Sequence, residues 1–177
     1  LVAYWSNACG GLEREGFAAF ANLKNVRSAM LWGSDVRDED LRHIGQMSNL
    51  TTIQLGSNWG LTGATLDQLA GLTKLRHLSL YGTKVKDDGL TRLPLLPRLE
   101  GIALGRNKVD GACLVHLSGL PSLKWLELDE TAVDNTVLKP LLQCQSLREI
   151  PAKDTKVTRA GLDSFFEQFP GFRTNVK

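Results

Sequence analysis

The sequence predicts an α/β fold built as a solenoid, in which a short strand, a turn and a short helix recur in stacked copies. The repeating unit is clearest over 75–98, which reads LRHLSLYGTKVKDDGLTRLPLLPR. Its first leucines have roughly the alternating period of a strand, and its last leucines are spaced like successive turns of a helix. One unit alone leaves its apolar face uncovered, so copies must stack on one another to bury it.

Copies of this unit fill the 177-residue chain. Counted from the first apolar residue of each copy, the repeats begin at Val2, Val26, Leu50, Leu75, Leu99, Leu123 and Leu147. We therefore expect a single domain over 1–177, with its C-terminal end capped by the phenylalanines of 165–177. The first repeat carries Trp5 and Asn7 at core positions, which is typical of a terminal or cut repeat.

Two repeats depart from the pattern. The third has one extra residue within 58–61, and Gly60 beside it suits a bulge. This insertion lifts Trp59 out of register, either over the edge of the fold or into solvent. In the seventh repeat, Pro151 removes a backbone donor, so strand pairing should be weakest there.

A column of small polar residues follows the strands, eight residues into each repeat. Its members are Gly10, Ser34, Asn58, Thr83, Asn107, Thr131 and Thr155. The chain turns there with its backbone partly buried, and short side chains that donate and accept hydrogen bonds can bridge neighbouring turns. We expect a structural ladder, because no hydroxyl in this column differs from its neighbours in a way that favours catalysis.

Composition gives no reason to expect several classes of partner and cofactor. The 21 basic residues are scattered among 19 acidic ones, and the net charge of +2 predicts neither nucleic acid nor an anionic membrane as partner. The three cysteines fit neither a disulfide framework nor a zinc site, so no metal and no cofactor is expected. No apolar run is long enough for membrane insertion, and no signal peptide is evident. A monomer is expected; the localisation is otherwise unknown, with the cytoplasm favoured.

The outward face of the predicted sheet carries the candidate binding site. The fifth repeat presents only Gly101, Ala103 and Gly105 there, which predicts a notch between aromatic and acidic walls. Trp32 and Tyr81 flank Gly56 at two strand spacings, about 10 Å, leaving a gap for a partner's side chain. Trp and Tyr are typical anchors of protein interfaces. The candidate ligand-binding residues are Trp32, His77, Tyr81, Arg106, Trp125, Glu127 and Asp129.

Two alternatives to this site remain open. The aromatic residues could instead pack on one another, with the small residues only relieving crowding. Glu127, Asp129 and Glu130 could form a cation site, but neighbouring basic residues favour a solvated mixed-charge surface.

Catalysis is poorly supported, and we expect no enzyme activity. His43 and His116 lie three repeats apart, about 14 Å by the strand spacing, too far to share a metal ion. Ser79 would be the nucleophile beside His77, but on an open sheet it has no oxyanion donors.

The pattern L-x-x-L-x-L-x-x-T-x-V-x-D-x-G-L, carried by 75–90, resembles the leucine-rich repeat family over essentially the whole chain. The Thr-x-Val, Asp and Gly-Leu elements look like the 24-residue bacterial variety frequent in planctomycete-type proteins. The repeats of F-box-associated receptors are similar but longer, with Cys at the ladder position. The resemblance implies a curved, right-handed horseshoe arc with a parallel sheet on the concave face, short helices on the convex face, and ligands bound mostly by the concave face.

These observations predict a non-enzymatic interaction module that binds a protein or peptide on its concave face. The alternative is the substrate-recognition segment of a larger effector or ligase enzyme whose catalytic domain lies outside this chain. A purely structural spacer is the third interpretation.

Overall fold

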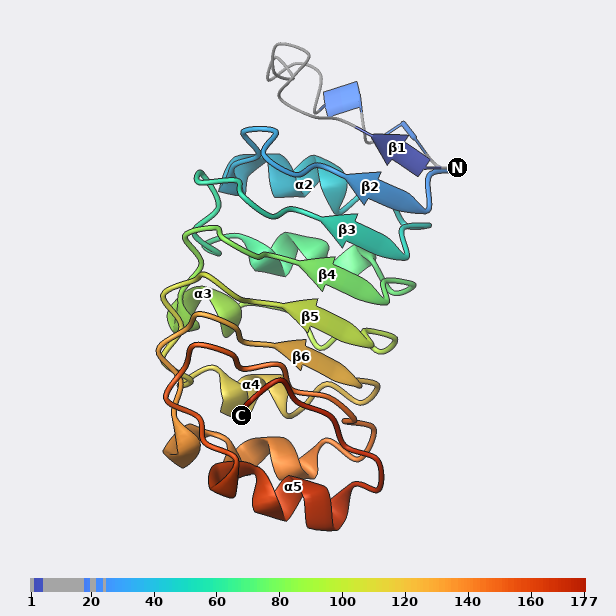
Figure 1. The fold of residues 1–177 in the computed structure, drawn as a ribbon. Helices are drawn as coiled ribbons and strands as arrows, with labels where there is room; N and C mark the ends of the chain where they lie inside the picture. The colour runs from blue at the N-terminus through green and yellow to red at the C-terminus, as the bar shows by residue number, and fades with distance from the viewer. Residues whose placement is uncertain (1, 5–17, 20–21, 24) are drawn as a thin grey trace.

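The computed structural model describes residues 2–4, 18–19, 22–23 and 25–177 as a solenoid of stacked strand, turn and helix units (Figure 1). Most of the first repeat, including Trp5, Asn7 and Gly10, lies outside the described residues. Within the described part, no helix is long and apolar enough to cross a bilayer.

One parallel sheet runs the length of the described chain, in the order β1-β2-β3-β4-β5-β6. Its strands are β1 (Val2–Tyr4), β2 (Ser28–Met30), β3 (Thr52–Gln54), β4 (His77–Ser79), β5 (Gly101–Ala103) and β6 (Trp125–Glu127). Neighbouring strands pair one repeat apart, so that Leu78 of β4 stands beside Ile53 and Ile102. Equivalent positions therefore stack in columns along the solenoid.

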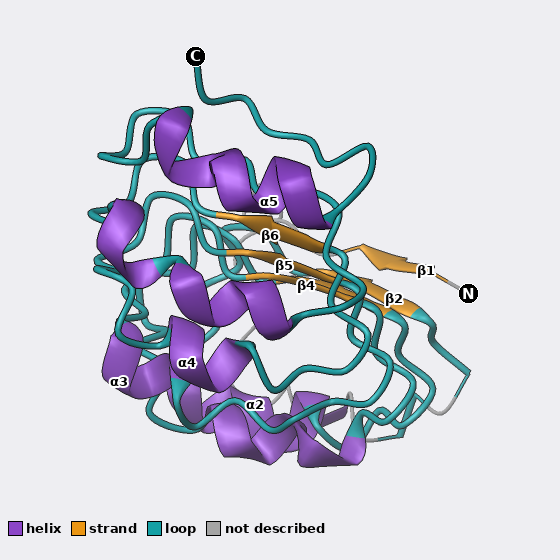
Figure 2. Ribbon diagram, turned by 90° about the horizontal axis from the view of Figure 1, so that it is seen from below, coloured by secondary structure: helices purple, strands orange, loops and turns teal. Residues whose placement is uncertain are grey.

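Short helices cover the opposite side of the core from the strands (Figure 2). The α-helices are α2 (Leu41–Ile44), α3 (Asp87–Leu90), α4 (Leu114–Leu117) and α5 (Asp163–Gln168). The 3₁₀-helices are η2 (Asp38–Asp40), η3 (Leu66–Gly71), η4 (Asn135–Val137), η5 (Lys139–Gln143) and η6 (Ala160–Leu162). One or two turns suffice because each helix only has to bury the leucines that face the core.

The core between the two faces is a set of fully buried leucine and valine columns. In the fourth repeat, Leu75, Leu80, Val85 and Leu90 have no exposed surface, and their counterparts in the neighbouring repeats are equally buried. At the C-terminal end, Phe165 packs against Phe169 and Phe172, with ring centroids 6.1 and 5.4 Å apart. These rings cover the last layer of leucines.

The polar column after the strands is the ladder that the sequence predicts. The Asn107 amide donates to Leu80 O at 2.7 Å and Leu104 O at 2.9 Å, and its Oδ1 lies 2.9 Å from the Thr83 hydroxyl. The Asn58 amide donates to Leu31 O in the preceding repeat. Each asparagine therefore joins its own turn to the turn of the preceding repeat.

Side chains on the other side of the turn join the repeats in pairs. Asp38 accepts hydrogen bonds from the backbone of Thr62 and Gly63, which joins the second repeat to the third. Asp87 accepts three backbone hydrogen bonds from the fifth repeat, and Asn135 accepts one from Thr158 of the seventh. Isolated parallel bridges join the same pairs, at Arg37 and Gly60, Lys86 and Lys108, and Asp134 and Lys156. The solenoid thus has a period of two repeats as well as one.

In the third and fifth repeats, Gly63 and Gly111 occupy the position that Asp38, Asp87 and Asn135 hold in the second, fourth and sixth repeats, so one pair of repeats meets the next without a side-chain acceptor. A Cβ on Gly63 would lie 2.9 Å from Gly89 Cα, and a Cβ on Gly111 would lie 2.3 Å from Val137 Cγ2. Close packing therefore replaces side-chain hydrogen bonds at these two boundaries.

The two irregular repeats adopt distinct conformations. The seventh repeat has no strand: Glu149 forms only isolated bridges with Trp125 and Arg173, in agreement with the weak pairing expected next to Pro151. In the third repeat, the side chain of Trp59 is 72% exposed, which settles that it faces solvent.

The ladder leads to a stability prediction. Asn107→Leu leaves several buried carbonyl groups without a donor, so we expect the free energy of unfolding to fall by about 3 kcal/mol. Thr131→Val is the control, since it removes only one hydrogen bond, to Leu128 O, and should cost about 1 kcal/mol. Urea denaturation at neutral pH measures both. Equal losses in the two variants would show that the asparagine has no special role.

Candidate functional site on the sheet face

Trp32 and Tyr81 form an aromatic stack on the sheet face. Their ring centroids are 5.8 Å apart with an interplanar angle of 27°. The Trp32 ring lies over Gly56, where a Cβ would come within 2.3 Å of it. The predicted gap between the two rings is therefore wrong, because Trp32 leans across the glycine and fills it. Nevertheless, Trp32 is still 46% exposed.

Arg106 and Glu130 extend this stack along the solenoid. Arg106 Cζ lies 5.6 Å from the centroid of the Tyr81 ring, and Arg106 Nε is 2.8 Å from Glu130 Oε1. Both residues have a positive φ, 55° and 58°, and the same position is left-handed in Gly33, Ser57, Gly82 and Asp154. The conserved turn geometry of the repeats thus directs these side chains along one row. We call Trp32, Tyr81, Arg106 and Glu130 the aromatic row.

His77 and Trp125 form a second group nearer the start of the strands. A Cβ on Gly101 would lie 3.0 Å from His77 Nδ1 and 3.1 Å from Trp125 Cε3, so both side chains close over the glycine. His77 is exposed and Trp125 is half-buried. The notch predicted over β5 is therefore filled at this end by its own walls.

Glu127 fills the other end of the predicted notch. Its carboxylate accepts hydrogen bonds from Gly105 N at 3.0 Å and Asp129 N at 2.9 Å. Only 7% of the residue is exposed. Desolvation raises the pKa of Glu127 even though both hydrogen bonds oppose the shift. Glu127 is thus a buried carboxylate that covers β5, and the open notch is a wrong prediction.

Asp129 anchors the C-terminal tail. Its Oδ1 accepts a hydrogen bond from Lys153 N at 2.7 Å, and both carboxylate oxygens accept from Asn175 Nδ2 at 3.0 and 3.1 Å. Asn175 Oδ1 in turn accepts from Ala152 N. Asn175 lies beyond the seven full repeats, and no sequence signal indicated this side-chain contact.

The basic residues around the acidic cluster have partners of their own. Lys124 pairs with Glu100 at 3.0 Å, and Lys153 lies 3.8 Å from Asp154. No group of three His, Cys, Asp or Glu side chains suited to a metal ion occurs in the part of the chain that the structure describes. The arrangement is that of a mixed-charge surface.

His116 and His43 make local hydrogen bonds, and the two described cysteines are buried. His116 Nε2 is 2.6 Å from Leu93 O, and His43 Nε2 is 3.1 Å from Arg42 Nε. Cys113 and Cys144 are buried, and desolvation raises the pKa of both thiols, that of Cys144 to about 11. Neither thiol is activated as a nucleophile.

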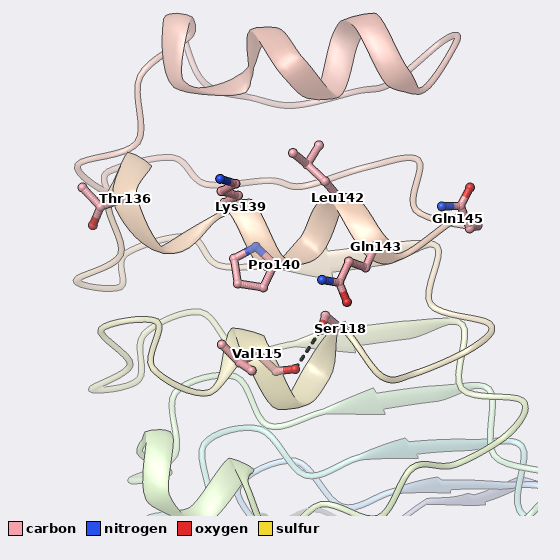
Figure 3. Close-up of a pocket in the computed structure, with 8 residues that line it drawn as sticks. All are labelled: Val115, Ser118, Thr136, Lys139, Pro140, Leu142, Gln143 and Gln145. Carbon is pink, nitrogen blue, oxygen red and sulfur yellow. Dashed lines mark hydrogen bonds between the residues drawn. The ribbon is translucent and has the colours of Figure 1, made fainter.

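A groove of about 770 Å³ lies on the helix face between α4 and η5 (Figure 3). Its apolar lining includes Val115, which is 67% exposed, together with Pro140 and Leu142. Gln143 and Gln145 contribute polar groups. None of the seven predicted site residues lines this groove, which lies on the helix face.

The stack leads to a prediction about packing. Gly56→Ala should displace the Trp32 ring and lower the free energy of unfolding by about 1–3 kcal/mol, because the added methyl overlaps the indole. In a Trp32→Ala background the same change should be nearly neutral. Chemical denaturation of the two single variants and the double variant measures the coupling. If Gly56→Ala lowered the free energy of unfolding by as much in the Trp32→Ala background as in the wild type, the added methyl would clash with a residue other than Trp32.

The buried carboxylate leads to a pH prediction. Because the folded state raises the pKa of Glu127, it holds the proton more tightly than the unfolded chain. The stability of the wild type relative to Glu127→Gln should therefore fall as pH rises above about 4.3, the ordinary glutamate value. Glu100→Gln is the opposite control. The pKa of Glu100 is lowered in the folded state, mainly by the hydrogen bond from Lys124. The stability that Glu100 contributes is therefore present at neutral pH and is lost as pH falls below the ordinary glutamate value. Denaturation between pH 3 and 7 distinguishes the two, and a pH-independent difference for Glu127→Gln would contradict the assignment.

Of the comparisons with known proteins, the one with solved structures gives matches. No protein-family model and no curated protein matches the sequence. Among solved structures, internalin C2 of Listeria monocytogenes is similar with a TM-score of 0.68 and 21% identity, over 93% of this chain and 66% of that one. Internalin F of the same organism is similar with a TM-score of 0.49 and 17% identity, over 89% and 56%. This chain thus spans just under two thirds of the length of internalin C2.

Internalins are leucine-rich repeat proteins, and an identity near one fifth supports a conclusion about the fold alone. The in-register parallel strands, the buried leucine columns and the polar ladder lead to the same conclusion. The chain folds as a leucine-rich repeat solenoid, with its parallel sheet on the concave face and its short helices on the convex face.

Proposed function

We propose that this solenoid is a non-enzymatic recognition module that binds a protein or peptide on its concave sheet face. The observation that carries the proposal is the aromatic row. Trp32 keeps almost half of its surface in solvent while Tyr81 and Gly56 fix the position of its ring. An exposed indole held in place loses little entropy on binding, which favours its use as an anchor.

The dimensions and chemistry of the row suit a protein partner. It runs from the second repeat to the sixth, four strand spacings or about 19 Å. Trp, Tyr and Arg are the residue types enriched at the energetic centres of interfaces. Salt bridging to Glu130 orients the Arg106 guanidinium, so a partner meets a preformed arginine.

The remaining predicted residues have different proposed roles. His77 and Trp125 form a second contact group at the other end of the strands, where His77 is exposed. Glu127 and Asp129 act by shaping the surface, since hydrogen bonds to neighbouring backbone occupy their carboxylates. The seven residues thus divide into partner contacts and supports.

Several finer assignments belong to the same proposal. We propose that the repeats are of the 24-residue planctomycete type and that the domain acts as a monomer, with the cytoplasm as the favoured compartment. The alternative, a substrate-recognition segment of a larger effector or ligase enzyme, uses the same sheet face and differs only in sequence outside this chain.

Affinity capture with a matched control tests the proposal. The wild type, a Trp32→Ala/Tyr81→Ala/Trp125→Ala variant and a Leu95→Ala/Val115→Ala/Leu142→Ala variant are used to capture partners, and calorimetry gives the affinity for each partner found. We expect the sheet-face variant to lose at least about tenfold in affinity, since hot-spot truncations each cost over about 1 kcal/mol. The helix-face variant should bind like the wild type.

Other outcomes would overturn the proposal. Equal affinity for wild type and sheet-face variant would exclude the concave face, and a loss confined to the helix-face variant would move the site to the groove beside Val115. A structural spacer would capture no specific partner in any form. Circular dichroism on each variant excludes unfolding as the cause.

A further inference from the structure

The third repeat exposes a tryptophan that neither the core nor the concave face uses. Trp59 is 72% exposed, more than any other large apolar side chain in the described residues. It lies in the turn that leaves the strand, where Leu61 N donates to Asn58 O at 3.1 Å. The single inserted residue of this repeat creates that turn.

The backbone on both sides of Trp59 is held rigidly. Asn58 is fully buried, with its amide bonded to Leu31 O and Leu55 O at 2.7 Å. Gly60 pairs with Arg37 of the preceding repeat, whose side chain lies where a Cβ on Gly60 would stand. The indole is therefore displayed from a fixed position, although burying it would stabilise the fold.

Exposed lysines lie in the turns of the next two repeats. Lys84 N donates to Leu61 O at 2.9 Å, which places Lys84 beside the turn. Lys86 and Lys108 are themselves paired by an isolated parallel bridge. All three lysines are exposed, and within the described residues none lies in a salt bridge. We call Arg37, Trp59, Lys84, Lys86 and Lys108 the loop edge.

The carboxylates near the loop edge are already engaged. Asp87 accepts backbone hydrogen bonds from Asp110, Gly111 and Cys113, which lower its pKa although desolvation, the largest single influence, opposes them. Asp110 accepts from Ala112 N and Asp88 from Gly89 N. Asp35 pairs with Arg37 at 3.0 Å. The carboxylates keep their negative charge, but hydrogen bonds within the protein or the pair with Arg37 occupy them, whereas Lys84, Lys86 and Lys108 have no salt-bridge partner among the described residues, so their ammonium groups are available to a partner.

We propose that the loop edge is a second interaction surface, which binds an acidic segment of a partner protein with an apolar side chain against Trp59. Charge complementarity identifies the acidic segment. A peptide can space its carboxylates to meet the lysines and avoid Asp110, whereas the regularly spaced charges of a phosphate backbone would also meet that exposed carboxylate. This surface is separate in its residues from the aromatic row, so it goes beyond the proposed function.

Nuclear magnetic resonance on the full chain tests the proposal. The probe is a synthetic peptide with glutamates flanking a central phenylalanine, titrated into the isotopically labelled protein. We expect shifts at the Trp59 indole N–H and at the amides of Lys84, Lys86 and Lys108, which weaken as salt is raised. Lys84→Gln/Lys108→Gln and Trp59→Ser should each lower the affinity about tenfold.

Matched controls make the result specific. Lys139→Gln on the helix face and Tyr81→Ala on the sheet face should bind the peptide like the wild type, so failure of this surface and failure of the concave site are distinguishable. A peptide with lysines in place of the glutamates should not bind.

Three results would overturn the proposal. The first is no shift at the loop edge, and the second is an equal loss of affinity in Lys139→Gln. The third is tighter binding, lost in the same loop-edge variants, to single-stranded DNA or to vesicles of phosphatidylserine and phosphatidylcholine, which would assign the edge to another class of macromolecule.

Discussion

The fold depends on hydrogen bonds made by buried amide and hydroxyl groups where each strand turns toward its helix. Backbone carbonyls in that turn are removed from water and need donors. Asn58 and Asn107 supply them within their own repeat and in the preceding repeat, so two turns share one side chain. The left-handed residue that immediately precedes each ladder residue then takes the same conformation in successive repeats. The direction in which Arg106 and Glu130 extend is a consequence of this shared turn.

Glycine on the sheet face decides how its large side chains lie. Trp32 lies over Gly56, His77 and Trp125 close over Gly101, and Glu127 covers Gly105. Each large residue leans onto the strand whose own position is empty. The face is consequently well packed before any partner arrives, and the exposed part of Trp32 is presented by a rigid surface.

Much of the architecture could be predicted from the sequence, because leucine columns and a polar ladder follow directly from chain periodicity. The candidate site was harder. Strand spacing predicts about 10 Å between Trp32 and Tyr81, which suits backbones two strands apart but ignores side chains that lean across a glycine. The open notch predicted at Gly101 and Gly105 is wrong for the same reason, because neighbouring side chains lean over both glycines. Contacts made by Asn175 could not be found, since they lie outside the repeat. Whether the seven residues bind a partner stays a prediction.

The pairing of repeats makes the true building block about 48 residues long. Asp38, Asp87 and Asn135 alternate with glycines that provide no side-chain acceptor for the next repeat: Gly63 packs closely on the backbone of Gly89, and Gly111 on the Val137 side chain. A single added or deleted repeat would set two acceptor repeats, or two boundary repeats, side by side. The acceptors of these turns therefore keep their partners when the length of such a solenoid changes in steps of two repeats, and a cut after 74 or after 122 leaves the hydrogen bonds of Asp38, Asp87 and Asn135 intact.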